Sequence, residues 1–386
     1  MPSEMPKTAD AIVIGGGVMG ASTAYHLARA GVKNVVLLEK EPYFGQGATG
    51  RCAGGIRHQF ATEVNVRLSI ASLAMLDRFE EETGQDPGVR KCGYLFVLTD
   101  ARDVASFEEN LKMQQRLGVA TRWMTPDEIH ARLPMMDFPD ALGGTYNPDD
   151  GLADPNSVVM GYIQRARALD ARPLTGVEVR KVLVKSGNAH GVVTQHGAIE
   201  APVIVNAAGP WAGLVGKMAG VDIPITPLRR QMITTTPLPD LPEDFPFVID
   251  FAQSLYFHRE GEGLLTGMSN PGEDPGFDQS IDEAWEVNAI EAAAARMPML
   301  EHAGRLSAWA GLYEVTPDAH PIFGPTPVDG FFIVGGFSGH GFMHGPISGK
   351  LMQEFILEGE AKTVDVSTLD LARFEQGRLI HEYNVV

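Results

Sequence analysis

The chain has 386 residues and a formal net charge of −18, with 44% hydrophobic and 21% charged residues. This balance is typical of a water-soluble protein with a substantial core, in one large unit or two domains. The negative charge disfavours nucleic acids and anionic membranes as partners, and no apolar run is long enough to span a bilayer. The two cysteines, Cys52 and Cys92, form neither a disulfide framework nor a CxxC zinc pattern, which predicts a cytoplasmic protein without a metal.

Residues 11–14 form a short, continuous apolar run, which predicts a strand buried on both faces of a parallel sheet. The sequence GGGVMG at 15–20 follows and fits the pattern G-x-G-x-x-G at the start of a helix that Gly31 ends. A second apolar run at 35–38 leads directly to Glu39. This order of strand, glycine turn, helix, strand and acid is typical of a dinucleotide-binding unit.

The residues of this unit suit a dinucleotide for physical reasons. Gly15 permits the tight turn, Gly17 lets the backbone approach a pyrophosphate, and Gly20 lets the helix pack closely on the sheet. The N–H groups and positive dipole at the helix start favour the phosphates. Glu39 can accept hydrogen bonds from ribose hydroxyls and would repel the additional phosphate of NADP.

A long glycine-rich loop, EPYFGQGATGRCAGGIRHQF at 41–60, follows the second strand. NAD-binding units usually continue here with another helix and strand, whereas such a loop suits backbone lying against an extended flat cofactor. The loop therefore favours FAD over NAD. Apolar residues at helical spacing then predict a helix over 64–84, and a later helix is expected over 345–358. The further predicted strands cover 177–184, 191–194, 201–206, 254–258 and 331–334.

Five segments spread along the chain resemble the D-amino-acid oxidase superfamily of flavoenzymes, specifically its sarcosine oxidase, dimethylglycine dehydrogenase and glycine oxidase branch. They are IVIGGGVMG with Glu39, ATGRCAGGIRH at 48–58, VNAAGPWA at 205–212, GLYEVTPDAHPIFG at 311–324 and GGFSGHGFM at 335–343. The resemblance implies an α/β fold, with a Rossmann-like FAD-binding domain of the GR2 type and an α+β substrate domain on an antiparallel sheet. It also implies FAD, with a second helix N-terminus facing the N1–C2=O edge of the flavin, where it would favour hydride uptake.

The implied FAD-binding domain is discontinuous and covers roughly 1–90, 145–225 and 305–386. The substrate-binding domain would be built from roughly 91–144 and 226–304.

The residues expected to contact FAD lie in the glycine-rich segments or beside the ribose and the adenine. They are Gly15, Gly17, Val18, Met19, Gly20, Glu39, Lys40, Thr49, Gly50, Arg51, Ala53, Gly54, Val179, Ala208, Gly209, Trp211, Gly311, Gly339, His340, Gly341, Phe342 and Met343. Some members of the branch attach flavin covalently, through a Cys before x-Tyr-x-x-Thr-Pro-Asp or a His in the glycine-rich loop. Gly311 and Arg51 stand at these positions, so we expect non-covalent FAD, with Cys52 as an alternative attachment point.

The resemblance also implies a substrate site. In sarcosine oxidases, an Arg in an Arg-His pair and a Lys in GHGFK bind the substrate carboxylate. Arg57 and His58 match the pair, whereas Met343 replaces the Lys and carries no charge. A single arginine can still bind a carboxylate bidentately, so a sarcosine-like substrate and a larger or less charged amine both stay open.

Three further residues are expected at the reacting end of this site. Tyr256 and Tyr313 match tyrosines that line the substrate pocket of relatives, and His340 is expected close to the flavin edge. His258 and His344 are additional pocket candidates, with a structural role as the alternative.

The expected reaction is hydride transfer to flavin N5 from the carbon next to nitrogen in a small, secondary or N-methyl, amine or amino acid, followed by hydrolysis of the imine. Leu265 falls where sarcosine oxidases keep a Lys that promotes the reaction with O2, which favours a dehydrogenase with another electron acceptor over an oxidase. Two alternatives stay open. One is the catalytic subunit of a hetero-oligomeric sarcosine, proline or opine dehydrogenase that passes electrons to a partner, and the other is a flavin-binding scaffold or sensor without turnover. The oligomeric state stays open, and a homo-oligomer and a hetero-oligomer are both compatible with the sequence.

Overall fold

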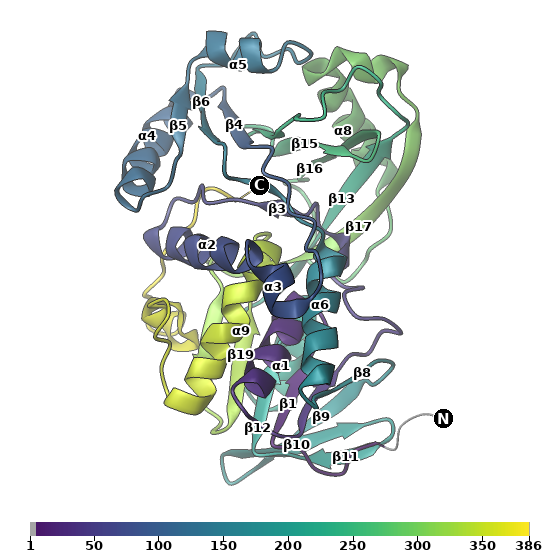
Figure 1. The fold of residues 1–386 in the computed structure, drawn as a ribbon, viewed down its shortest axis with the longest axis vertical. Helices are drawn as coiled ribbons and strands as arrows, with labels where there is room; N and C mark the ends of the chain where they lie inside the picture. Colours follow the sequence, from purple (N-terminus) through teal and green to yellow (C-terminus); the bar gives the residue numbers. More distant parts are fainter. Residues whose placement is uncertain (1–4, 386) are drawn as a thin grey trace.

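The computed structural model describes residues 5–385. They form two layers, each made of a sheet and the helices that cover it, and the two lie end to end along the long axis of the molecule (Figure 1). One layer contains a six-stranded sheet in the order β18-β19-β12-β1-β2-β8, and the other an eight-stranded sheet in the order β17-β13-β16-β15-β14-β4-β6-β5. This architecture confirms the predicted α/β fold with a second, α+β unit.

The six-stranded sheet is parallel except for β18, which pairs antiparallel with β19. β1 and β2 are buried over their full lengths, as their uninterrupted apolar runs predicted. The strands of this sheet are β1 (Ala11–Ile14), β2 (Val35–Leu38), β8 (Arg172–Leu174), β12 (Val203–Asn206), β18 (Ile322–Pro325) and β19 (Phe331–Gly335).

Helices cover one face of this sheet. Alternate residues of β1 point to opposite faces, so Val13 packs with the helices while Ile12 packs with a small three-stranded sheet and α7 (Ala212–Met218). The helices of the first face are α1 (Val18–Arg29), α2 (Glu63–Leu76), α3 (Phe79–Thr83), α6 (Pro155–Ala168) and α9 (Gly341–Glu358). The small sheet comprises β9 (Val179–Lys185), β10 (Asn188–Thr194) and β11 (Gly197–Glu200).

α1 and α9 cross closely because two glycines of α9 face α1. A Cβ on Gly345 would lie 2.3 Å from Val18, and one on Gly349 would lie 2.2 Å from Ser22. The Ser22 hydroxyl also donates a hydrogen bond to the Pro346 carbonyl at 3.0 Å. The close crossing brings the N-terminal ends of the two helices side by side.

Two helix predictions differ from the structure. The helix predicted over 64–84 is divided between α2 and α3, and the break lets Phe79 pack edge-on against Tyr162, with ring centroids 4.9 Å apart. The last long helix begins at Gly341 rather than at 345, because its first turn lies within the glycine-rich segment, where no apolar period marks it.

The eight-stranded sheet is antiparallel throughout except where β4 pairs parallel with β14. α5 (Pro126–Arg132) and α8 (Glu283–Arg296) pack on one face, and α4 (Ala101–Arg116) packs Phe107 against the other. The strands are β4 (Tyr94–Leu98), β5 (Arg122–Met124), β6 (Gly143–Asn147), β13 (Thr226–Thr235), β14 (Phe247–Asp250), β15 (Leu255–Glu260), β16 (Gly263–Met268) and β17 (Arg305–Val315). The short strands β3 (Gly55–Ile56) and β7 (Gly151–Leu152) pair separately.

The predicted domain boundaries stay a prediction. β17, which the predicted ranges place with the FAD-binding unit, is hydrogen-bonded to β13 along its length in the eight-stranded sheet. In residues 5–385, no helix is both long enough and apolar enough to cross a membrane. The cytoplasmic location also stays a prediction.

Candidate active site

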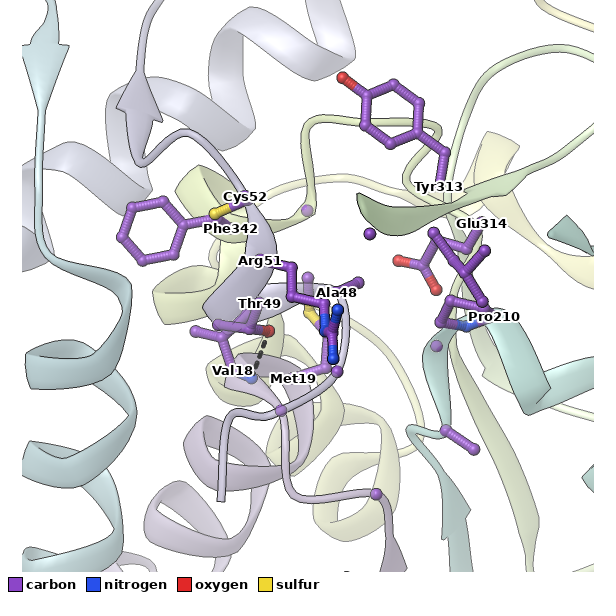
Figure 2. Close-up of a pocket in the computed structure, with 18 of the residues that line it drawn as sticks. Val18, Met19, Ala48, Thr49, Arg51, Cys52, Pro210, Tyr313, Glu314 and Phe342 are labelled. Atoms are coloured by element: carbon purple, nitrogen blue, oxygen red, sulfur yellow. Dashed lines mark hydrogen bonds between the residues drawn. The ribbon is translucent and has the colours of Figure 1, made fainter. Parts of the chain in front are cut away.

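A cavity of about 620 Å3 lies where the two layers meet. The glycine turn after β1 and the loop after β2 form one end, and β13, β15 and β17 of the eight-stranded sheet contribute to the other. Figure 2 shows part of its lining, with the start of α1 facing the loop that carries Thr49, Arg51 and Cys52. A cavity of this size suits a small-molecule ligand.

The first glycine turn is held in the geometry that a dinucleotide site requires. Gly15 has a φ of 108°, and a Cβ there would lie 2.3 Å from the Ala207 carbonyl oxygen. Gly17 faces more open space, with only Thr49 near its Cβ position at 3.1 Å. Gly20 does not line the cavity, because its Cα packs on Gly15, whose carbonyl oxygen would be 1.8 Å from an added Cβ.

Glu39 stands at the end of β2 beside this turn. Its Oε2 accepts the Gly16 N–H at 2.6 Å, and its Oε1 accepts the Glu41 N–H at 2.8 Å. Burial raises the pKa of this carboxyl, and the two N–H donors oppose that shift. The carboxylate is thereby oriented at the cavity wall, where it can accept further hydrogen bonds.

The second glycine turn leads into α9 beside the start of α1. Ser338 adopts a φ of 50° and Gly339 a φ of 104°, and a Cβ on Gly339 would lie 2.5 Å from the Tyr313 ring. Because α1 and α9 cross closely, both helix starts border the same cavity. The Val18 N–H at the start of α1 donates to Thr49 Oγ1 at 3.1 Å, the dashed line of Figure 2.

Most of the residues predicted to contact FAD line the cavity, and Gly20 and Gly50 do not. Gly50 lies within the loop and packs on its backbone, where a Cβ would be 2.3 Å from the Gly45 carbonyl oxygen. Lys40 lies over the Trp211 ring, with Nζ 3.7 Å from the ring centroid. Those that line it are Gly15, Gly17, Val18, Met19, Glu39, Lys40, Thr49, Arg51, Ala53, Gly54, Val179, Ala208, Gly209, Trp211, Gly311, Gly339, His340, Gly341, Phe342 and Met343.

The two positions that resemble covalent attachment points lie next to each other. A Cβ on Gly311 would be 3.0 Å from the Arg51 Cβ, and Arg51 donates to the Ala310 carbonyl at 2.8 Å. Cys52 also lines the cavity, and burial raises the pKa of its thiol to about 11. A thiol with that pKa is protonated at neutral pH and is therefore a poor nucleophile.

Arg57 is buried and lines the cavity. Its guanidinium stacks 3.9 Å from the centroid of Phe60 and donates to the backbone carbonyls of Gln59 and Asn384. Burial lowers the pKa of Arg57 from its usual high value. These carbonyls are neutral, so they orient the guanidinium without cancelling its charge.

Three predicted histidines do not line the cavity. His58 Nδ1 lies 2.6 Å from an Asp150 carboxylate oxygen, which also accepts the His58 backbone N–H at 2.9 Å. His258 lies 3.0 Å from the Arg259 carbonyl, and burial lowers its pKa to about 4. His344 lies 2.9 Å from the hydroxyl of Ser69, and burial lowers its pKa to about 3. Each of these three imidazoles contacts another protein group and none of them borders the cavity.

Tyr256, Tyr313 and His340 do line the cavity. Tyr256 comes from β15 and Tyr313 from β17, so the antiparallel sheet supplies two phenols to the same end. His340 is buried, and neither ring nitrogen has a hydrogen-bond partner among the described residues. Burial lowers the pKa of His340 well below its usual range, which keeps the ring neutral.

Four charged residues that line the cavity were missed from the sequence, and two of them, Glu314 and Arg230, come from the eight-stranded sheet. Glu314 follows Tyr313 on β17 but extends in a different direction (Figure 2). Its Oε1 accepts the Phe337 N–H at 3.4 Å, while Oε2 has no partner among the described residues. Burial raises the pKa of Glu314 to about 7. The other is Arg230 of β13. Because side chains alternate along a strand, the sequence could have predicted that Arg230 and its neighbour Arg229 point to opposite faces of the sheet.

Comparison with known proteins agrees with this geometry. The chain is 32% identical to human mitochondrial sarcosine dehydrogenase over 98% of its length, and 32% identical to mouse mitochondrial dimethylglycine dehydrogenase over 97%. It spans less than half of these relatives, 42% and 45% of their lengths.

The fold matches a crystal structure of L-proline dehydrogenase from P. horikoshii with a TM-score of 0.90 and 33% identity, covering 97% of this chain and all of that one. The sequence pattern of the family described as FAD dependent oxidoreductase (DAO) matches residues 10–355. These matches, together with the cavity between the two sheets, show that the chain belongs to the DAO family of FAD-dependent oxidoreductases.

Proposed function

We propose that this chain binds FAD without a covalent link and oxidises a C–N bond of a small secondary or N-methyl amino acid. The observation that carries the proposal is one continuous cavity that joins the start of α1 and Glu39 at one end to Arg57, Tyr256 and Tyr313 at the other, with the start of α9 beside Tyr313. Sarcosine, dimethylglycine and proline, which name the matched dehydrogenases, are all amino acids whose nitrogen carries an additional carbon substituent.

The residues present fit FAD. Gly17 and the start of α1 would hold the pyrophosphate, Glu39 would accept the ribose hydroxyls, and Val179 would lie beside the adenine. The start of α9 would direct N–H groups toward the developing negative charge of the flavin. When bound, FAD supplies the acceptor for a hydride.

The residues at the three candidate positions support FAD binding without a covalent link. Gly311 has no side chain, Arg51 is not a nucleophile, and the Cys52 thiol has a pKa of about 11. Acid precipitation of the purified protein should therefore leave the yellow colour in the supernatant. Colour retained in the pellet would contradict this part of the proposal.

The substrate end would orient the amino acid and favour its reactive form. Arg57 would bind the carboxylate, and the guanidinium groups of Arg57 and Arg230 would lower the pKa of a bound amine by repelling its ammonium form. The neutral nitrogen then has a lone pair available. As the adjacent C–H bond breaks and its electron pair leaves as hydride, that lone pair forms the C=N bond. Water subsequently adds to the carbon and releases the amine and a carbonyl product.

We also propose an electron acceptor other than O2. Leu265 stands where sarcosine oxidases keep a lysine, and it is 2% exposed in a cluster with Met232, Phe247 and Tyr256. The uncharged side chain offers no stabilisation to a developing superoxide. Turnover under air with an artificial dye and without peroxide release would support this, and stoichiometric peroxide would contradict it. The identity of a partner subunit and the oligomeric state stay predictions.

The test of the proposed function is anaerobic bleaching of the bound flavin by a panel of sarcosine, dimethylglycine, proline, glycine and an uncharged secondary amine. We expect rapid bleaching by one or more of the N-substituted amino acids. A yellow protein that none of them bleaches would contradict the proposal and favour a scaffold or sensor.

A further inference from the structure

Two adjacent arginines of β13 have opposite environments. The Arg229 guanidinium is surrounded by acids, with ion pairs to Glu273 at 3.0 Å, Asp278 at 3.0 Å and Asp282 at 3.8 Å. Because successive side chains of a strand point to opposite faces, Arg230 is directed to the other side, where it lines the cavity.

Arg230 has a very different set of contacts. One guanidinium N–H donates to the Arg229 carbonyl at 2.9 Å, and the guanidinium lies 5.2 Å from the centroid of the Tyr313 ring. Its Nε, like that of Arg229, has no hydrogen-bond partner within residues 5–385, but no described carboxylate forms an ion pair with Arg230, in contrast to Arg229. An incompletely paired cation in a partly desolvated site is costly unless an anion completes it.

The position of Arg230 indicates which kind of anion would pair with it. On the sheet, Arg230 pairs in register with Gly311 of β17, two residues from Tyr313. The positive charges of Arg230 and Arg57 both oppose the rise that burial causes in the pKa of Tyr313, so both guanidinium groups act on this phenol. The phosphates of a dinucleotide would lie at the start of α1, whereas Arg230 comes from the eight-stranded sheet, with the substrate-site tyrosines.

We infer that Arg230 is a second carboxylate-binding residue of the substrate site, so that the cavity selects N-substituted amino acids carrying two carboxylates. The inference rests on the proposed function, because that function identifies the reaction of the bound amino acid. The binding of a second carboxylate by Arg230 can be tested separately from that reaction. Arg57 would hold the carboxylate next to the reacting carbon, and Arg230 would hold the second one across Tyr313. Met343, in place of a lysine, contributes no cation, which leaves the two arginines to define this preference.

The test uses two pairs of compounds that differ by one carboxylate. Methylthioacetate and thiodiacetate cannot form an imine, so their binding is measured by the change in flavin absorbance of the holoenzyme. Sarcosine and iminodiacetate are the corresponding amines, and their reaction is measured by anaerobic bleaching. The variants are Arg230→Gln and, as the matched control on the same strand, Arg229→Gln.

In the wild-type protein we expect thiodiacetate to bind about tenfold or more tightly than methylthioacetate, as one charge-assisted pair provides. Arg230→Gln should abolish that ratio and leave the affinity for methylthioacetate within about twofold, and Arg229→Gln should leave the ratio unchanged. Equal affinities for both thioethers in the wild-type protein, or equal losses for both in Arg230→Gln, would overturn the inference.

The outcomes also separate this inference from the proposed function. Bleaching by sarcosine or proline with no effect of Arg230→Gln on the thiodiacetate ratio would leave the function standing and overturn the second site. An Arg230-dependent ratio in a protein that no amine bleaches would support the second site and contradict the function.

Discussion

The Glu39 carboxylate accepts the Gly16 N–H at 2.6 Å, so the acid at the end of β2 is fixed to the glycine turn at the end of β1. The same carboxylate accepts the Glu41 N–H, which orients it along the cavity wall. One side chain thus holds the turn in place and, in the proposed function, would accept hydrogen bonds from a ribose.

Replacing Glu39 with Gln should weaken FAD binding about 10- to 100-fold, because hydrogen bonds to a charged acceptor contribute roughly 1.5–3 kcal/mol. Isothermal titration of the apoprotein with FAD measures this. Glu200→Gln, an exposed change on β11, is the control and should leave the affinity unaltered. An unchanged affinity in Glu39→Gln would remove Glu39 from the ribose site.

Replacing Arg57 with Gln should raise KM for carboxylated amines about 10- to 100-fold, by loss of a charge-assisted pair. The KM for a secondary amine without a carboxylate should change little. Because Arg57 also binds the Gln59 and Asn384 carbonyls, the thermal unfolding of each variant is measured alongside. Equal increases in KM for both classes of amine would exclude Arg57 as the carboxylate anchor.

Glu314 makes stability depend on pH. Its pKa rises from 4.5 to about 7 on folding, so protonation favours the folded state and the contribution is lost as pH rises through that interval. Glu314→Gln should match the wild-type protein below about pH 4.5 and be more stable by up to about 3 kcal/mol above about pH 7.

Urea unfolding of both apoproteins over this pH range checks the prediction for Glu314. The buried His344 acts in the opposite sense, since its pKa falls to about 3 and its contribution is lost as pH falls below about 6.5. The difference between wild type and Glu314→Gln cancels that term. A difference that does not change with pH would contradict the assignment.

We expect the α1–α9 crossing to make FAD binding sensitive to a single methyl group. A Cβ on Gly345 would lie 2.3 Å from Val18, so Gly345→Ala should cost about 1–3 kcal/mol of stability and displace the start of α1. Both the unfolding free energy and the affinity for FAD should fall. Gly276→Ala, where nothing lies within 4 Å of the added Cβ, is the control. Loss of stability without loss of FAD affinity would show that the crossing does not position the α1 N-terminus.

Local patterns were sufficient for the part of the fold that surrounds Glu39. The strand, glycine turn, helix and second strand depend on neighbours within about one helical or strand repeat, so their periods predicted them. The predicted contact residues beside the glycine turns mostly line the cavity for the same reason.

The remaining features depend on residues distant in sequence. His58 is held by Asp150, 92 residues away, and no local signal predicts that pairing. The acids that surround Arg229 lie 44 to 53 residues along the chain, at Glu273, Asp278 and Asp282, so only the folded sheet distinguishes it from Arg230. Strand alternation predicts opposite faces for the two arginines but not which face borders a cavity.

The most direct measurement is the anaerobic absorbance spectrum of the purified holoprotein before and after addition of an N-substituted amino acid. The account predicts a yellow protein whose flavin absorbance is lost on mixing and returns when an electron acceptor is added. A protein that stays colourless after incubation with excess FAD would contradict it at its foundation.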